Sequence, residues 1–181
     1  MARHVRCWHA HPAYGSPRPK KRPILGGQAL DARRVVIASD HAGFELKQAL
    51  LAELRALGCH AIDLGTNGPE SVDYPDFADR LATAMAAGEA ESGVLVCGTG
   101  IGISIGANRH SHIRAGLAHD VTSARLMREH NDANVLALGA RLIGIETARD
   151  CLKVFLETSF EGGRHQRRVD KLSPPAATRP A

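Results

Sequence analysis

Apolar residues follow two alternating patterns along this chain from residue 34 onward. Short runs of consecutive apolar residues predict buried strands, and longer segments with apolar residues at every third or fourth position predict amphipathic helices. The predicted strands are Val35–Ser39, Ala61–Leu64, Val94–Cys97, Ala115–Ala118 and Val135–Leu138. The predicted helices are Phe44–Leu57, Phe77–Ala87, Ile103–Asn108, Thr122–His130, Glu146–Thr158 and, after a Gly162-Gly163 break, Arg164–Leu172, with a loop over Gly65–Pro75.

Strands that alternate with helices and are apolar on both faces are typical of a parallel sheet covered on both sides. Because crossovers are right-handed, the pattern predicts an α/β fold, a single doubly wound, Rossmann-like three-layer sandwich with a five-stranded parallel sheet and an extended C-terminal helix. Ligands of such folds bind at the carboxyl ends of the strands. The residues at the carboxyl ends of the five predicted strands are Asp40-His41, Gly65-Thr66, Cys97-Gly98-Thr99, His119-Asp120 and Gly139-Ala140-Arg141.

The two ends of the chain lack these patterns. Residues 1–33 are rich in proline and basic residues, and we interpret them as a disordered basic N-terminal extension. Residues 34–172 then form one domain, and the Pro- and Ala-rich residues 173–181 form a flexible tail. A transit peptide is the less favoured interpretation of the extension, because residues 1–33 contain a single Ser and no amphipathic face.

The net charge of +4 comes from the start of the chain. The first 34 residues hold eight Lys or Arg and one acid, whereas the other 147 hold 15 basic and 18 acidic residues. A mildly acidic folded part argues against nucleic-acid binding, and no apolar run approaches the ~20 residues of a membrane span. Cys7, Cys59, Cys97 and Cys151 form no CxxC pair, which argues against a zinc site or a disulfide scaffold and favours the cytoplasm.

The most informative stretch is an apolar run that ends in Cys97 and leads into the loop Gly98-Thr99-Gly100-Ile101-Gly102. Glycines let successive N–H groups turn to one side, and at a helix N-terminus such a loop stabilises an anion. The same amides favour a Cys97 thiolate that can take a proton from carbon. Other interpretations stay open: a plain turn, a merely buried cysteine, or a dinucleotide site, although Ile103 stands where that fingerprint has Gly.

Three further groups have both a structural and a functional interpretation. Asp40-His41 either binds sugar oxygens or forms an N-cap with a neighbouring His. His130-Asn131-Asp132 either caps a helix, with the Asn left-handed, or presents His130 as an acid for a sugar ring oxygen. The basic residues Arg141, Arg164 and Arg168 either clamp a phosphate, the last two from one helical face, or form a solvated charged surface.

These residues resemble a known family, the sugar-phosphate isomerases that include ribose-5-phosphate isomerase type B and the LacA and LacB proteins. The resemblance lies in six motifs that run in family order across residues 34–172. They are Ser39-Asp40-His41-Ala42-Gly43-Phe44, Asp63-Leu64-Gly65-Thr66, Asp73-Tyr74-Pro75, Cys97-Gly98-Thr99-Gly100-Ile101-Gly102-Ile103-Ser104, Glu129-His130-Asn131-Asp132-Ala133-Asn134, and Glu161-Gly162-Gly163-Arg164-His165-Gln166-Arg167-Arg168-Val169.

The resemblance implies an aldose–ketose isomerase of the pentose phosphate pathway, free of metal and cofactor, that interconverts D-ribose 5-phosphate and D-ribulose 5-phosphate through an enediolate. It implies Cys97 as the base, His130 as the ring-opening acid, and Asp40, His41 and Asn131 as sugar ligands. It further implies an anion hole at Gly98, Thr99, Gly100, Ile101 and Gly102, and phosphate binding by Arg141, Arg164 and Arg168. Some relatives carry the base as a Glu where this chain has Ile103.

The same resemblance implies a homodimer or homotetramer whose sites are shared between subunits, with no nucleic-acid or membrane partner. Two alternatives stay open for the function. One is an isomerase of a hexose 6-phosphate, such as allose or galactose 6-phosphate. The other is a non-catalytic module that binds a sugar phosphate or a nucleotide.

Overall fold

Five parallel strands form one sheet in a computed structural model of the protein, which describes residues 32–172. The interpretations of residues 1–31 and 173–181, a basic extension and a flexible tail, lie outside the described residues. The strands are β1 (Arg34–Ser39), β2 (His60–Asp63), β3 (Ser92–Cys97), β4 (Ala115–Ala118) and β5 (Val135–Gly139), in the order β2-β1-β3-β5-β4. The five-stranded parallel sheet predicted from the sequence is therefore confirmed.

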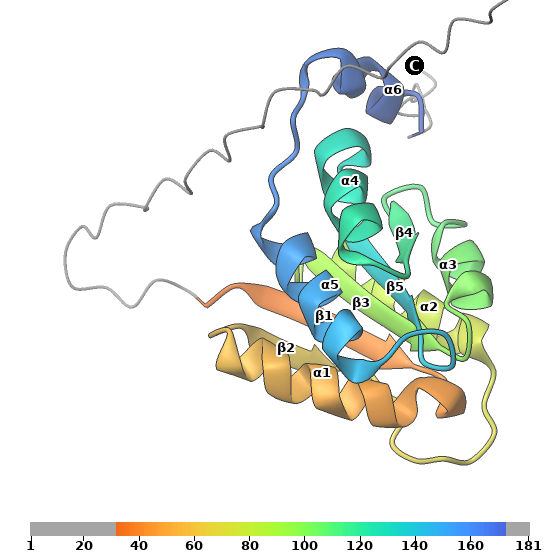
Figure 1. Ribbon diagram of the computed structural model, residues 1–181. Helices are drawn as coiled ribbons and strands as arrows, with labels where there is room; N and C mark the ends of the chain where they lie inside the picture. Colours follow the sequence, from red (N-terminus) through yellow and green to blue (C-terminus); the bar gives the residue numbers. More distant parts are fainter. Residues whose placement is uncertain (1–31, 173–181) are drawn as a thin grey trace, which may run out of the picture. The chain divides into compact units, whose positions relative to one another are not determined.

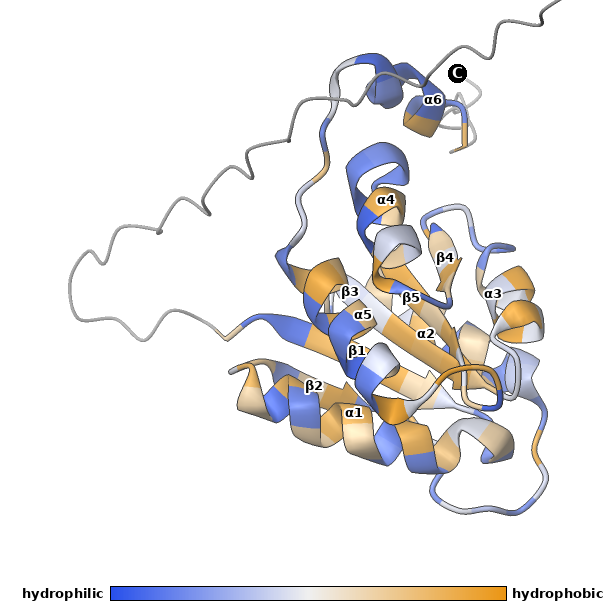
Figure 2. Ribbon diagram, viewed as in Figure 1, coloured by the Kyte–Doolittle hydropathy of each residue, from blue (hydrophilic) through white to orange (hydrophobic). Residues whose placement is uncertain are grey.

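Helices cover both faces of this sheet (Figure 1). They are α1 (Phe44–Ala56), α2 (Tyr74–Ala86), α3 (Ile101–Ala107), α4 (Val121–Asn131), α5 (Ile145–Glu157) and α6 (Gln166–Asp170), with 3₁₀ turns η1 (His41–Gly43) and η2 (Gly163–His165). Buried side chains of α1, α4 and α5 pack on one face of the sheet, and those of α2 and α3 pack on the other. Figure 2 shows the apolar strands between helices whose residues alternate between polar and apolar.

The strand order places a crevice between β1 and β3. The chain leaves β1 toward β2 on one side, and it leaves β3 toward β4 and β5 on the other. Connections that diverge in this way leave an opening at the carboxyl ends of the two strands, and parallel α/β proteins bind ligands at that opening.

Two predicted elements differ from the structure. The loop predicted over Gly65–Pro75 ends early, because Pro75 is tolerated in the first turn of α2, which begins at Tyr74. The extended C-terminal helix predicted over Arg164–Leu172 is instead the short turn η2 followed by the five-residue α6. Only His165 and Val169 are buried there, so little packing is available to stabilise a longer helix.

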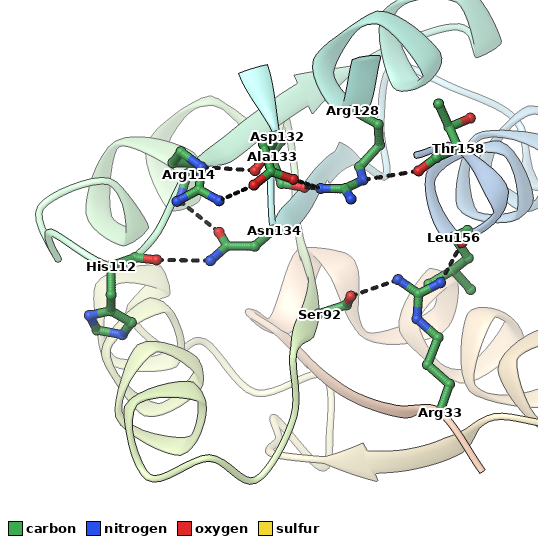
Figure 3. Close-up of polar contacts among 10 residues, drawn as sticks. All are labelled: Arg33, Ser92, His112, Arg114, Arg128, Asp132, Ala133, Asn134, Leu156 and Thr158. Carbon is green, nitrogen blue, oxygen red and sulfur yellow. Dashed lines mark hydrogen bonds and ion pairs between the residues drawn. The ribbon is translucent and has the colours of Figure 1, made fainter. Parts of the chain in front are cut away.

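The folded part includes Arg33, one residue before the predicted domain start. Its guanidinium donates to Ser92 Oγ at 2.9 Å and also to the carbonyl of Leu156. Figure 3 shows Arg33 joining these two segments. None of the helices between residues 32 and 172 is both long and apolar enough to cross a membrane.

Candidate active site

A cavity of about 220 Å³ opens at the crevice between β1 and β3. Its wall consists of nine residues: Asp40, His41, Ala42, Tyr74, Cys97, Gly98, Thr99, Gly102 and Arg141. Seven of these nine were predicted from the sequence as site residues. The structure therefore brings together the polar pair after β1, the thiol and glycine loop after β3, and the arginine after β5.

Cys97 is the last residue of β3, and its side chain is almost completely buried. The N–H of Gly100 donates to Cys97 Sγ at 3.0 Å, which stabilises negative charge on the sulfur. Gly100 has a φ of +77°, and it is the N-cap of α3, so the thiol also lies beside a helix N-terminus. The amide hydrogen bond and the nearby helix N-terminus distinguish this sulfur from a cysteine that is buried by apolar contacts alone.

Some N–H groups of the glycine loop donate to other atoms of the protein, and others have no partner and are free for a ligand. The Gly100 amide is used by the sulfur, and the Ile101 amide donates to Thr99 Oγ1 at 3.3 Å. The amides of Gly98, Thr99 and Gly102 have no hydrogen-bond partner among residues 32–172. These three N–H groups are thus available to an anion, whereas those of Gly100 and Ile101 are used within the loop.

Two glycines outside this loop let neighbouring segments approach it closely. A Cβ on Gly43 would lie 2.6 Å from the carbonyl oxygen of Val96, and one on Gly139 would lie 2.6 Å from that of Thr99. Side chains at either position would therefore push the β1 or β5 connection away from β3. The short distance between the Asp40-His41 turn and Cys97 depends on this close backbone packing.

Asp40 and His41 are both held by backbone groups. Asp40 is the N-cap of η1, and its Oδ1 accepts from the Gly43 N–H at 3.0 Å. The Nδ1 of His41 accepts from the Val72 N–H at 3.2 Å, which orients the ring and leaves Nε2 for a ligand. The structural interpretation of Asp40 as a cap is confirmed, and the same turn carries His41 to the cavity.

Tyr74 is a cavity residue that was not predicted from the sequence. It is the first residue of α2, 41% exposed, and a Cβ on Gly102 would lie 2.8 Å from its ring. The motif Asp73-Tyr74-Pro75 was the available signal in the sequence, because Pro75 marks the first turn of a helix.

His130 and Asn131 do not line this cavity. They end α4, which starts after β4 at the carboxyl edge of the sheet and runs back for 11 residues, or about 16 Å, toward the start of β5. Within one chain, His130, the predicted acid, thus lies near the amino ends of the strands, whereas Cys97, the predicted base, lies at their carboxyl ends. Asn131 instead lines a second cavity of about 390 Å³, together with Arg114, Met127 and Leu172.

The left-handed residue at the end of α4 is Asp132, with a φ of +45°, and not Asn131, as the structural interpretation of this motif had it. Both Asn and Asp tolerate this conformation, and the sequence alone does not distinguish them. Asn131 remains the last helical residue, and its side chain is exposed.

The C-terminal turn packs against the end of α4 through two histidines. The His130 and His165 rings are stacked, with centroids 4.3 Å apart and planes 4° apart. His165 is buried, and burial lowers its pKa below the ordinary value of 6.5, helped by the nearby charges of His130, Arg164 and Arg168. The predicted phosphate ligands Arg164 and Arg168 are exposed beside this stack.

One group within residues 32–172 has the residue types of a metal site. The side-chain ligand atoms of His130, Glu161 and His165 lie within 4.8 Å of one another. The lone pairs of an imidazole lie in its ring plane, so two parallel stacked rings cannot both aim at one ion. In addition, Arg164 Nε donates toward His165 Nε2 at 3.3 Å. This arrangement does not fit a metal.

The chain is similar to known sugar-phosphate isomerases over nearly its whole folded length. A family model described as Ribose/Galactose Isomerase matches residues 35–172. The putative sugar phosphate isomerase YwlF of Bacillus subtilis is 48% identical over 141 residues, covering 77% of this chain and 95% of the relative. Ribose-5-phosphate isomerase B of Escherichia coli is 45% identical over 141 residues, covering 78% and 95%.

Solved structures give the same result for the fold. A ribose 5-phosphate isomerase of Thermotoga maritima is 48% identical with a TM-score of 0.77, over 79% of this chain and 99% of that chain. Ribose 5-phosphate isomerase B of Anaplasma phagocytophilum is 49% identical with a TM-score of 0.74, over 81% of this chain and 100% of that chain. Identity at this level across a whole domain identifies the family, whereas the relatives' names differ in how closely they specify the substrate.

Proposed function

We propose that this chain, which belongs to the ribose/galactose isomerase family, interconverts D-ribose 5-phosphate and D-ribulose 5-phosphate. The observation that carries the proposal is a single cavity walled by the Cys97 thiol, the Asp40-His41 pair and the Arg141 guanidinium. A thiolate can move a proton on carbon, the polar pair can bind sugar oxygens, and a guanidinium can bind a phosphate. An aldose–ketose isomerase of a sugar phosphate needs these three capacities in one place.

The reaction proceeds by proton transfer at Cys97. Its thiolate takes the proton from C2 of the open-chain aldose, the electron pair forms the C1–C2 double bond, and O1 becomes negative. The free amides of Gly98, Thr99 and Gly102 are suited to stabilise this oxyanion, and one such donor contributes about 3 kcal/mol in other enzymes. The proton then returns to C1, while the O2 hydroxyl proton moves to O1 and gives the ketose. No oxidant or reductant is consumed.

A second copy of the chain completes the site in this proposal. His130 and Asn131 lie across the sheet from the Cys97 of their own chain, so they can reach only a sugar held by a neighbour. The cavity of about 220 Å³ is smaller than the roughly 300–1,000 Å³ of small-molecule sites, which agrees with a missing wall. The exposed side chains of Ile101 and Ile105 on α3, the helix that follows the glycine loop, offer apolar surface to a partner.

Each subunit then has a separate task at the shared site. One supplies Cys97, the free loop amides and Arg141. The other supplies His130, which protonates the ring oxygen during ring opening, and the exposed Arg164 and Arg168, which bind the phosphate.

A kinetic panel tests the substrate. We expect ribose 5-phosphate to show a higher kcat/KM than allose 6-phosphate and galactose 6-phosphate with the purified protein. A hexose phosphate that exceeds ribose 5-phosphate tenfold would overturn the substrate assignment. Absence of turnover with all three, together with measurable binding, would favour the non-catalytic module.

Replacement of the thiol tests the mechanism. We expect Cys97→Ala to lower kcat by about 100- to 10,000-fold, the usual contribution of a positioned acid or base, with little change in the affinity for ribose 5-phosphate. Cys59→Ala is the matched control, because Cys59 is a half-buried cysteine outside the cavity. Normal turnover by Cys97→Ala would exclude this residue as the base.

A further inference from the structure

The end of α4 is held by a carboxylate between two guanidinium groups (Figure 3). Asp132 Oδ2 accepts from Arg114 Nη2 at 2.9 Å, and Asp132 Oδ1 accepts from Arg128 Nη1 at 2.9 Å. Arg114 precedes β4, and Arg128 lies one turn earlier in α4. All three side chains are partly buried, with exposed fractions of 33%, 20% and 16% for Asp132, Arg114 and Arg128. Partial burial makes these pairs stronger than ordinary surface salt bridges.

The two arginines also bind the backbone around Asp132. Arg114 Nε donates to the carbonyl of Asp132 at 2.8 Å, and Arg128 Nη1 donates to the carbonyl of Ala133. Asn134 accepts from the Arg114 N–H at 2.7 Å and donates to the carbonyl of His112 at 2.8 Å. The turn from α4 into β5 is thus fixed at both its side chains and its carbonyl groups.

Asp132 is the only residue other than glycine with a positive φ in the described part of the chain. Glycine adopts this conformation without strain, whereas Asp adopts it at a small cost that a local interaction can offset. The carboxylate provides one, since it neutralises two arginines that would otherwise repel each other at this turn. The residue type at 132 therefore reflects a need for the side chain as well as for the left-handed backbone.

The network reaches the C-terminal segment as well. Arg128 Nε donates to the carbonyl of Thr158 at 3.4 Å, and the N–H of Glu161 donates to the carbonyl of Glu129 at 3.0 Å. Two residues before Asp132, the ring of His130 stacks on His165. The position of His130 is therefore fixed in two ways: by the hydrogen bonds between the end of α4 and residues 158–161, and by the stacking of its ring on His165.

We propose that Asp132 is a positioning residue for the isomerisation, which holds His130 in the orientation that ring opening requires. The inference rests on the proposed function, because it assigns a task to the site that function describes. Asp132 touches no substrate in this scheme and acts through the turn it stabilises. Displacement of a catalytic group by about 1 Å can cost about a hundredfold in rate, so loss of the carboxylate has a measurable effect on turnover.

Two variants separate the charge from the backbone conformation. Asp132→Asn keeps the size and tolerates positive φ but removes the charge, and Asp132→Gly keeps the backbone conformation and removes the side chain. We expect each to lower kcat for ribose 5-phosphate by about ten- to a hundredfold. Glu146→Gln is the control, since Glu146 also pairs with an arginine, Arg149, but lies on the surface of α5. It should retain the wild-type kcat.

A double-mutant cycle with His130 distinguishes positioning from general destabilisation. In a His130→Asn background, Asp132→Asn should lower kcat by less than about twofold further, because the group it positions is already absent. Exchange of the C1 proton of ribulose 5-phosphate with D₂O, which needs Cys97 but no ring opening, should stay close to the wild-type rate in Asp132→Asn. A variant that is merely unstable would lose both activities together.

The outcomes separate the two proposals. If the wild-type protein does not turn over ribose 5-phosphate, the proposed function fails. If the wild type is active and both Asp132 variants match its kcat, the positioning inference alone is overturned. Equal losses from Asp132→Asn in the His130 and His130→Asn backgrounds would also overturn it, because the effect would then be independent of His130.

Discussion

The Nζ atom of Lys47 is fully buried and lies 2.5 Å and 2.7 Å from the two carboxylate oxygens of Asp63. Asp63 Oδ1 also accepts from the Gly65 N–H at 3.0 Å, and the carbonyl of Gly65 accepts from the Ser39 N–H at 2.7 Å. Ser39 directly precedes Asp40 at the cavity. The ion pair therefore connects the core of α1 to the turn that carries the polar pair.

The two partners of this pair are expected to differ in their contribution to stability. Asp63→Asn leaves a charged ammonium in the core and should lower the free energy of unfolding by about 3–5 kcal/mol. Lys47→Met should cost less, because the Asp63 side chain is 28% exposed and water can solvate its charge. Urea denaturation measures both, and the double variant should cost less than the sum. A larger loss for Lys47→Met would contradict this account.

Gly100 is expected to be required for activity and stability because a side chain there would clash with its neighbours, in addition to the strain of its positive φ. A Cβ there would lie 2.4 Å from Leu117 Cδ1 and 2.9 Å from the carbonyl carbon of Leu138. Gly100→Ala should therefore move the amide away from Cys97 Sγ and lower kcat as well as stability. Gly58→Ala is a close control, with a φ of +76° and open space around it, and should cost only about 1 kcal/mol with unchanged kcat. Equal effects of the two substitutions would argue against the contact explanation.

Most of the fold was predictable because the strands are short apolar runs between amphipathic helices. Val35 and Ile37 face one helical layer, and Val36 and Ala38 face the other, so the double burial that the pattern implied is present. The C-terminal helix was overpredicted, since the periodicity of Arg164–Leu172 contains no information on how little core that segment contacts. Helical spacing alone does not stabilise so short a segment.

The cavity was predictable to the extent that its residues follow strands. Asp40 directly follows β1, Cys97 is the last residue of β3, and Arg141 lies two residues after β5. Parallel strands bring their carboxyl ends together. Tyr74 was missed because it begins a helix, where no pattern of the sheet applies. The separation of His130 from Cys97 follows from the direction of α4, and motif order gives no distance.

Among the three cysteines of residues 32–172, alkylation should be selective for Cys97. Burial raises the pKa of Cys151 to about 11, so only about one in a thousand of its side chains is a thiolate at pH 8. Burial also raises the pKa of Cys59. Iodoacetamide at pH 8 should therefore inactivate the protein in step with labelling of Cys97, as read by peptide mass spectrometry. Labelling of Cys151 before unfolding in urea would contradict the burial of that thiol.

Acidification should loosen the C-terminal turn through His165. Its pKa in the folded state is below 6.5, mainly because burial disfavours the charged ring, so the unfolded turn binds a proton more readily than the folded one. The packing of residues 163–170 should be fully stable above pH 6.5 and weaken as pH falls below it. Amide hydrogen exchange, corrected for its intrinsic pH dependence, measures this change. In His165→Gln the protection should no longer vary with pH over that range, and an unchanged pH dependence would exclude His165.

Mixing of inactive variants tests whether the site is shared between two copies. In a dimer of Cys97→Ala and His130→Ala chains, one site lacks both groups, whereas the other combines an intact Cys97 with an intact His130. Random mixing yields half mixed dimers with one working site each, so activity should return to about a quarter of wild type. Cys97→Ala mixed with Arg141→Ala is the control, because both residues line the same cavity and every site stays defective. If each copy held a complete site of its own, neither mixture would regain activity, and the assignment of His130 to a partner subunit would be wrong.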